Sequence, residues 1–374
     1  MLFHILQFIY QTIFVVVLLG TSLWRPVVGQ SALHSFTVPA DSVAIDSLLV
    51  RISRVSERVS YSGVQIRIVR HRGKALELRW QEYHWHPERT VVIFLAPEDL
   101  RNSTLVLKGD QVKYRRNRHV RKKFRYGAPK DLLKNGQIFK EIALLRRNYH
   151  VTVSPGPIFV DQTTISLNVT PRHPGRPALQ ALVDTQSGLL LQTKRLQDGF
   201  ASDSLAEISQ FLEISYEEPD TTIFTRAWSE TKLIKKTRKA KIYSDLTKLM
   251  TSYKGEVLIP KKVPDGFTLL QIKSIQRKEK SFLHFLYGDG LTFISLFQSK
   301  EDGEPLHKKG DKRKRKKREK EREPSHEKGY LKKAEHHGPF VIIRGKQDNI
   351  AYNILGEIPR AELAEMAESL ETMH

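Results

Sequence analysis

The apolar hairpin pattern of residues 282–298, FLHFLYGDGLTFISLFQ, constrains the fold more than any other stretch. Two runs rich in aromatic and branched residues flank Tyr287-Gly-Asp-Gly290. Glycine supplies the positive backbone φ that a tight turn between antiparallel strands requires. Apolar side chains occur in both phases of the alternation, and a two-stranded hairpin of this kind is not stable alone in water. The rest of the chain must therefore supply strands and helices that cover it.

A longer series of alternating segments precedes the hairpin. Apolar residues at spacings of three and four predict an amphipathic helix over residues 42–60, and from Gly63 the period changes to two. Helical spacing returns once, between residues 132 and 145. The pattern predicts an α+β fold with a curved antiparallel sheet over a helical layer. The predicted strands are 64–69, 76–82, 90–95, 103–107, 111–115, 158–160, 164–169, 178–183, 189–196 and 208–216.

The length of 374 residues favours two domains over one large core. We expect a first domain over residues 32–225, a basic linker over 226–254 and a smaller α/β domain with an antiparallel sheet over 255–374. The run 308–322 contains no apolar residue, so residues 300–337 are predicted to be a disordered basic insertion within the second domain.

The first 29 residues decide the expected compartment. Residues 1–28 are almost wholly apolar, and the small residues before Gln30 predict an export signal cleaved after Gly29. The segment is long and has no Lys or Arg before its apolar centre, so an uncleaved membrane anchor is the alternative. Either interpretation places the bulk of the chain outside the cytoplasm.

The net charge of +21 indicates an acidic partner. In a cytoplasmic protein this charge would indicate nucleic-acid binding, which we do not expect behind an export signal. The run 308–322 and the loop 115–125 are candidates for contact with an anionic membrane surface. The loop would serve equally as a charged edge that prevents strand pairing. The run would serve equally as a solvated segment with no specific partner.

Residues for catalysis do not form a recognisable set. The chain has no cysteine, which excludes disulfides, thiolate zinc sites and cysteine nucleophiles. It has no Gly-x-Ser-x-Gly elbow, dinucleotide fingerprint or Walker loop. His84-Trp85-His86 would place two imidazoles on one face of a strand, but no third metal ligand stands nearby. We therefore predict a binding protein with no enzymatic activity, metal or cofactor.

The candidate ligand site is an apolar cavity under the predicted helix 42–60, on the concave face of the first sheet. An ordinary dry core would show the same periodicity, so the pattern leaves both open. The residues predicted to line the cavity are Val64, Ile66, Ile68, Leu76, Leu78, Trp80, Ile93 and Leu95.

The order of several short motifs resembles two related families. Tyr61-Ser-Gly-Val-Gln65 after a helix, Leu107-Lys-Gly-Asp-Gln111 in the meander and Val183-Asp-Thr-Gln-Ser-Gly-Leu189 resemble the lipoprotein-carrier-like (LolA/LppX) domain. The hairpin with His284-x-x-Tyr287-Gly-Asp-Gly290, followed by Gly356-Glu-Ile-Pro359, resembles the C-terminal domain of the RseB/MucB family. Both parts in this order, behind an export signal, favour RseB/MucB over a carrier alone.

The resemblance implies a periplasmic regulator of a sigma-E-type envelope stress response. Such proteins bind the periplasmic domain of a transmembrane anti-sigma factor and shield it from proteolysis. Their first domain, an unclosed β-barrel, senses lipid, lipopolysaccharide or the acyl chains of mislocalised lipoprotein. Their second domain supplies much of the anti-sigma contact, for which we predict His284, Tyr287, Phe293 and Phe297. The alternative is a periplasmic lipoprotein or lipid carrier of the LolA/LppX type. The basic insertion and the cationic linker depart from the family pattern.

Overall fold

The computed structural model contains two compact units, divided between Lys235 and Lys236 within the predicted linker, and each unit is described by itself. The expected signal segment and residues 301–331 of the expected insertion 300–337 lie outside the described residues, whereas Lys332–His337 of that insertion is a strand, β17, and not disordered. Within the described part of the chain, no helix has the length and apolar character to cross a membrane. The described residues are 42–71, 74–109, 111–117, 139, 141–197, 205–233, 240–253, 255–277, 280–300, 332–337 and 340–373.

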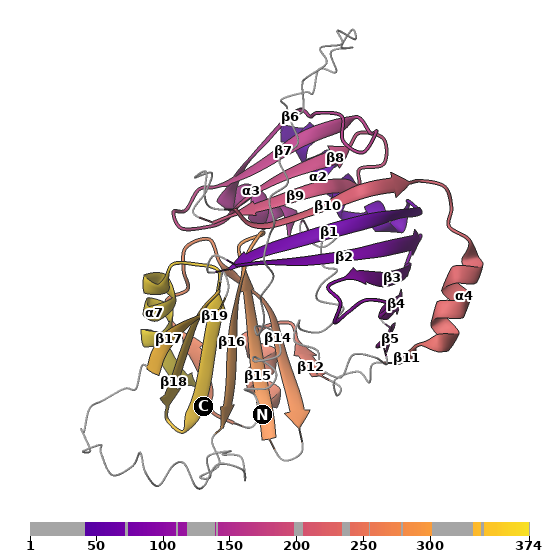
Figure 1. Ribbon diagram of the computed structural model, residues 1–374. Helices are drawn as coiled ribbons and strands as arrows, with labels where there is room; N and C mark the ends of the chain where they lie inside the picture. Colours follow the sequence, from indigo (N-terminus) through magenta and orange to yellow (C-terminus); the bar gives the residue numbers. More distant parts are fainter. Residues whose placement is uncertain are drawn as a thin grey trace. The chain divides into compact units, whose positions relative to one another are not determined.

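The first unit is built on an eleven-stranded antiparallel sheet with the order β11-β5-β4-β3-β2-β1-β10-β9-β8-β7-β6. The sheet curves, and its edge strands β6 and β11 do not pair with each other, so it is open (Figure 1). The strands are β1 (Tyr61–His71), β2 (Lys74–Trp85), β3 (Arg89–Ala96), β4 (Thr104–Lys108), β5 (Gln111–Arg115), β6 (Tyr149–Pro155), β7 (Thr164–Pro171), β8 (Ala178–Asp184), β9 (Leu190–Leu196), β10 (Leu205–Ser215) and β11 (Lys232–Leu233).

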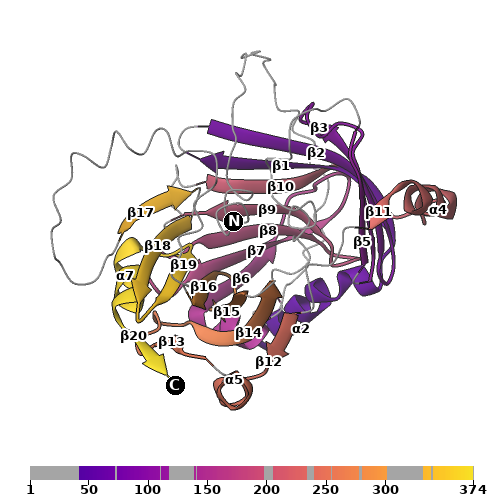
Figure 2. The same cartoon turned by 90° about the horizontal axis from the view of Figure 1, so that it is seen from below.

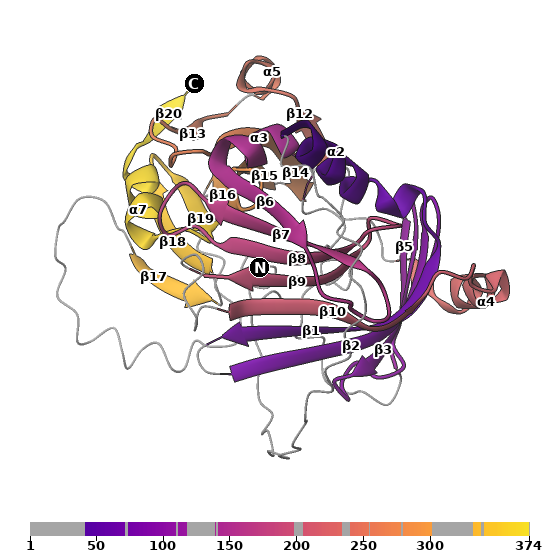
Figure 3. The same ribbon diagram turned by 90° about the horizontal axis from the view of Figure 1, so that it is seen from above.

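Helices cover both faces of this sheet. Helix α2 (Ser42–Ser53), the short 3-10 helix η1 (Val55–Glu57) and α3 (Ile142–Asn148) belong to one side, which we call the inner face; α2 and α3 lie beside β6 (Figure 3). Leu49 and Ile52 of α2 are fully buried. Helix α4 (Thr221–Glu230) packs on the other side, the outer face, against β3 and β4 (Figure 2). Apolar burial against both faces stabilises the sheet.

Most predicted elements of the first unit are present, with specific exceptions. The helix expected over 42–60 is shorter, because α2 ends at Ser53 and η1 follows it. The strand expected at 158–160 is only an isolated bridge between Phe159 and Gln162. Three described elements of the first unit were not predicted: β6, which follows the helical spacing of residues 132–145, the two-residue strand β11, and α4. Helix α4 begins directly after Asp220, whose carboxylate caps the helix by accepting from the amide of Thr222 at 2.9 Å.

The second unit has a seven-stranded antiparallel sheet with the order β12-β14-β15-β16-β19-β18-β17 and a separate pair, β13 with β20. Helices α5 (Leu246–Ser252) and α7 (Arg360–Glu368) contribute Leu249, Leu363 and Met366 to its core. The strands are β12 (Ala240–Tyr243), β13 (Val257–Pro260), β14 (Thr268–Arg277), β15 (Lys280–Gly288), β16 (Phe293–Lys300), β17 (Lys332–His337), β18 (Phe340–Gln347), β19 (Ile350–Gly356) and β20 (Leu370–Met373).

The predicted hairpin is the centre of this second sheet, as β15 and β16. Its turn uses Gly290, whose φ is 104°. The carboxylate of Asp289 accepts from the amides of Leu291 and Thr292 at 2.9 and 2.7 Å, which closes the turn. Gly288 serves another purpose. A Cβ there would lie 2.5 Å from a methyl carbon of Leu270, so glycine permits close packing.

Candidate functional site

A cavity of about 230 Å³ lies on the inner face of the first sheet. This volume is far above the roughly 10–15 Å³ that a single water needs. Strands β1, β2, β9 and β10 form much of its wall, and α2 with η1 contributes from the opposite side. Its lining is Ile52, Val55, Ser56, Tyr61, Gln65, Trp80, Glu82, His84, Thr90, Leu107, Leu189, Leu190, Leu191, Thr193, Ser209, Gln210 and Phe211.

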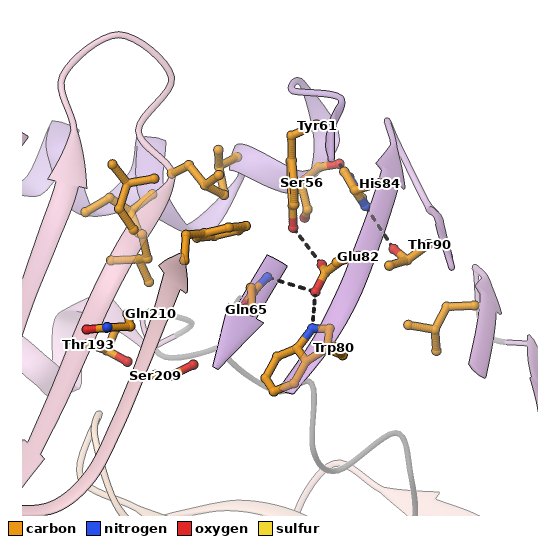
Figure 4. A pocket seen from close by; sticks show the side chains of 17 residues that line it. Ser56, Tyr61, Gln65, Trp80, Glu82, His84, Thr90, Thr193, Ser209 and Gln210 are labelled. Atoms are coloured by element: carbon orange, nitrogen blue, oxygen red, sulfur yellow. Dashed lines mark hydrogen bonds between the residues drawn. The ribbon is translucent and has the colours of Figure 1, made fainter. Parts of the chain in front are cut away.

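Glu82 is the centre of a polar cluster in this cavity. Its carboxylate accepts hydrogen bonds from the hydroxyl of Tyr61 at 2.8 Å, the side-chain amide of Gln65 at 2.8 Å and the indole nitrogen of Trp80 at 2.9 Å. Figure 4 shows the three donors converging on the carboxylate from β1 and β2. All three donors are neutral, so the carboxylate is solvated by hydrogen bonds but has no counter-charge among them.

The register of the strands brings these residues together. Tyr61 pairs with His84 and Gln65 pairs with Trp80 across β1 and β2, so their side chains share the inner face. Glu82 lies between Trp80 and His84 in the same phase of β2. The inner face therefore carries a polar cluster next to buried apolar side chains such as Leu78 and Phe211.

Burial sets the protonation preferences in the cluster. It raises the pKa of the Glu82 carboxyl, and the hydrogen bonds from Trp80 and Tyr61 offset part of that rise. Burial first, and the charge of Glu82 second, raise the pKa of Tyr61 well above its usual value. The Tyr61 hydroxyl is therefore a donor at every physiological pH.

His84 is held in its neutral form beside this cluster. Its Nε2 lies 2.9 Å from the carbonyl oxygen of Ser56 and its Nδ1 lies 2.9 Å from the hydroxyl of Thr90. A carbonyl only accepts, so Nε2 carries the proton and Nδ1 accepts from Thr90. Burial lowers the pKa of His84, and the hydrogen bond to Ser56 opposes that shift. The imidazole stacks on Tyr61 with ring centroids 5.1 Å apart and helps to hold the donor to Glu82 in place.

His84 and His86, the two imidazoles of the His84-Trp85-His86 segment, lie in different surroundings. Both nitrogens of His84 are engaged, and His86 is exposed. Across the described residues, no group of three His, Cys, Asp or Glu side chains is arranged to hold a metal ion.

The register divides the eight predicted cavity residues between the two faces of the sheet. Leu76, Leu78 and Trp80 lie on the inner face, and of the eight only Trp80 lines the cavity. Val64, Ile66 and Ile68 pair with Gln81, Arg79 and Glu77 and therefore lie on the outer face. Ile93 packs in the cluster under α4, and Leu95 sits at a bulge between β2 and β3. The expectation that the eight residues share one face is thus corrected; ligand contact at Trp80 stays a prediction.

A sequence signal for the observed site does exist. In β2 the phase that contains Leu76, Leu78 and Trp80 continues with Glu82 and His84. A carboxylate in the apolar phase of a strand must find hydrogen bonds in the interior. Glu82 lies at the end of the predicted strand 76–82 but is not among the residues predicted to line the cavity. Nothing in the sequence around Tyr61 or Gln65 indicated that these residues belong to the site.

The four predicted partner residues also divide between two faces, in the second unit. His284 and Phe297 lie opposite each other on β15 and β16, and their rings stack with centroids 4.2 Å apart. Phe293 is in the same phase and is 46% exposed. Tyr287 is in the other phase and is buried in the core. Burial, with Lys273 nearby, lowers the pKa of His284 to about 4, so its ring is neutral at physiological pH.

These features define a class of protein: an open, curved antiparallel sheet that encloses a cavity, followed by a smaller unit of sheet and helices. The same class of fold is found in MucB. Comparison with solved structures finds MucB in complex with MucA(peri) at 16% identity and a TM-score of 0.56, covering 88% of this chain and 99% of that chain. MucB in the Pseudomonas aeruginosa MucA/MucB complex matches with the same identity and TM-score, and MucB alone matches at 17% identity with a TM-score of 0.51. The chain is thus similar in fold to MucB through both units.

No protein-family model matches the chain, and no curated protein matches it by sequence. A LolA superfamily protein from Nitrosomonas europaea matches 49% of this chain with a TM-score of 0.24, which is too low to carry an argument.

Proposed function

We propose that this chain is a non-enzymatic periplasmic regulator of the RseB/MucB type, which binds the periplasmic domain of a transmembrane anti-sigma factor. The observation that carries the proposal is the similarity to MucB, which was crystallised in complex with MucA(peri), over 88% of this chain and 99% of that one. A match that covers 88% of this chain extends over both units and favours a shared mode of partner binding over a likeness of one sheet alone.

The second unit offers a surface suited to such a partner. Phe293 is 46% exposed, and it lies on the same face of the sheet as the stacked pair of His284 and Phe297. Exposed aromatic side chains on a rigid sheet are frequent anchors of protein interfaces. We propose that these three residues contact the partner, whereas Tyr287 supports them from the core.

The first unit would supply the sensing function. Its cavity is lined by apolar side chains from α2, β9 and β10 around the polar cluster of Glu82. We propose that lipid or the acyl chain of a mislocalised lipoprotein or lipopolysaccharide enters this cavity and weakens the hold on the anti-sigma factor. The basic run 308–322 would bring the protein to an anionic membrane surface.

Calorimetry tests the regulatory claim. The chain, as exported and processed by its expression host, is titrated with the periplasmic domain of a membrane anti-sigma factor from the same genome, before and after addition of lipopolysaccharide fragments. We expect binding without the fragments and release with them. Absence of binding to every such domain would remove the regulatory claim.

The alternative function is a periplasmic lipoprotein or lipid carrier that uses the first unit alone. The cavity is the observation that supports it. It predicts acyl chains that co-purify with the protein. If mass spectrometry finds no acyl chains in an organic extract of the protein and the protein binds an anti-sigma domain, the result favours the regulator over the carrier.

A further inference from the structure

The described lining of the cavity in the first unit contrasts with the basic composition of the whole chain. The chain contains 62 Lys and Arg residues and has a net charge of +21. None of the described residues that line the cavity is Lys or Arg, and Glu82 is the single acidic residue among them. An anionic head group placed inside would meet Glu82 and, among the described lining residues, no cation.

The hydrogen bonds of Glu82 leave room for one more donor. Oε1 accepts from Tyr61, and Oε2 accepts from Gln65 and Trp80. A carboxylate has about four acceptor positions, so three neutral donors do not saturate it. Arg67 is on the same face of β1, two residues beyond Gln65, but its guanidinium is paired with Glu207 at 2.7 Å. Glu82 is therefore oriented by its neighbours without being neutralised by them.

We propose that the cavity binds amphiphiles that carry an aliphatic chain and an ammonium group, with the ammonium donating to Glu82, and that it excludes chains whose inserted end is a carboxylate or phosphate. This inference rests on the proposed role of the cavity as the ligand site and names its ligand class. A lipid with a phosphate head group would enter with its acyl end and keep the phosphate outside.

The physical reason is the cost of burying an unpaired charge. A buried carboxylate loses hydration, and three neutral hydrogen bonds restore only part of it. An ammonium supplies both the missing donor and a counter-charge, and a hydrogen bond between two charged groups is stronger than one between neutral groups. A carboxylate ligand would place two like charges together.

The same cost makes binding dependent on pH. The titratable groups that line the cavity around Glu82 are Tyr61 from β1 and His84 from β2, and both are neutral, as described above. The residues from α2, η1, β9 and β10 in the lining are not titratable. Affinity for an ammonium should therefore follow the ionisation of Glu82, falling as the pH drops through the raised pKa of its carboxyl.

Calorimetry with octylamine, octanol and octanoate tests the inference on the processed chain at neutral pH. These probes share one chain and differ in the charge of the head group. We expect octylamine to bind at least about ten-fold more tightly than octanoate, which corresponds to roughly 1.4 kcal/mol, with octanol between them. Glu82→Gln should reduce octylamine affinity to that of octanol. Glu77→Gln, on the same strand but exposed and paired with Arg79, is the matched control and should change nothing.

Two results would overturn the inference. One is octanoate binding as tightly as octylamine. The other is an octylamine preference that survives Glu82→Gln. If that variant does not fold, the pH series on the native chain decides, because an octylamine affinity that stays constant from about pH 8 to about pH 4 contradicts a role for Glu82. If none of the three probes binds, the cavity is not a ligand site, whereas the separate titration with the anti-sigma domain still tests the regulatory function.

Discussion

The indole nitrogen of Trp80 donates a hydrogen bond to the carboxylate of Glu82, 2.9 Å away and two residues further along the same strand. The contact joins a fully buried indole of the inner face to Glu82, the one acidic residue among the described residues that line the cavity. On the inner face of β2, a buried carboxyl therefore lies among apolar side chains. The first prediction concerns that carboxyl.

Glu82→Gln should make the first unit more stable at neutral pH. Burial raises the pKa of Glu82 above its unfolded value of 4.5, so the folded state holds the proton more tightly than the unfolded state does. Stability from this group is present below that pH and is lost as the pH rises through the folded pKa. Gln removes this loss, and the gain in stability is about 1.4 kcal/mol for each pH unit that separates the unfolded from the folded pKa.

Urea denaturation across a pH series measures this effect. The stability difference between Glu82→Gln and the native chain should be positive at neutral pH and should shrink toward pH 4.5. Glu77→Gln, whose side chain is exposed, serves as the control without this pH trend. A difference that grows as the pH falls would contradict the assignment.

Gly63→Ala should destabilise the first unit by roughly 1–3 kcal/mol through overpacking. An added Cβ would lie 2.5 Å from the carbonyl oxygen of Glu213 and 2.9 Å from a ring carbon of Phe211. The carbonyl belongs to the neighbouring strand β10, so the backbone would have to move. Thermal denaturation followed by circular dichroism measures the change. Ser62→Ala, at the adjacent position, is the control, and an equal effect of both substitutions would argue against the close approach.

The second unit should lose stability as the pH falls through the range in which free histidine is protonated. Burial lowers the pKa of His284 from 6.5 to about 4, so the unfolded state takes up the proton first. Stability is then lost between these two values, by up to about 3 kcal/mol at the low end. The ring signals of His284 in an NMR titration should shift only near the low end. An ordinary titration near pH 6.5 would show that the ring is not buried in solution.

Phe293→Ser should weaken binding of the anti-sigma domain while changing the stability of the unit by only about 0.5 kcal/mol. The side chain is 46% exposed, so the folded state gains little from it. Loss of an aromatic anchor typically costs an interface about 1–2 kcal/mol or more. Calorimetry and urea denaturation of the same variant separate the two effects. Ile158→Ser, at a 77% exposed apolar position of the first unit, is the control that should leave the affinity unchanged.

Local signals were sufficient for many of the elements. The alternation in residues 64–95 predicts β1, β2 and β3, because side chains that alternate across a sheet leave a period of two in the sequence. The turn at Asp289 and Gly290 was also predictable from the local sequence, because few residues other than glycine tolerate a φ of 104°. Strand β6 and helix α4 were missed because their apolar residues lie beside stretches with a different period.

The sequence by itself determined which segments alternate, where the hairpin of the second unit turns, and that a carboxylate stands in the apolar phase of β2. Only the tertiary structure decided which phase of each strand faces inward. Val64 and Gln65 are neighbours in β1, and both phases of that strand contain apolar residues, so periodicity alone does not choose between them. The pairing of Gln65 with Trp80 and the packing of α2 on one side of the sheet decide which phase faces inward. These contacts join residues far apart in the sequence, and they bring the donors Gln65 and Trp80 to the carboxylate of Glu82.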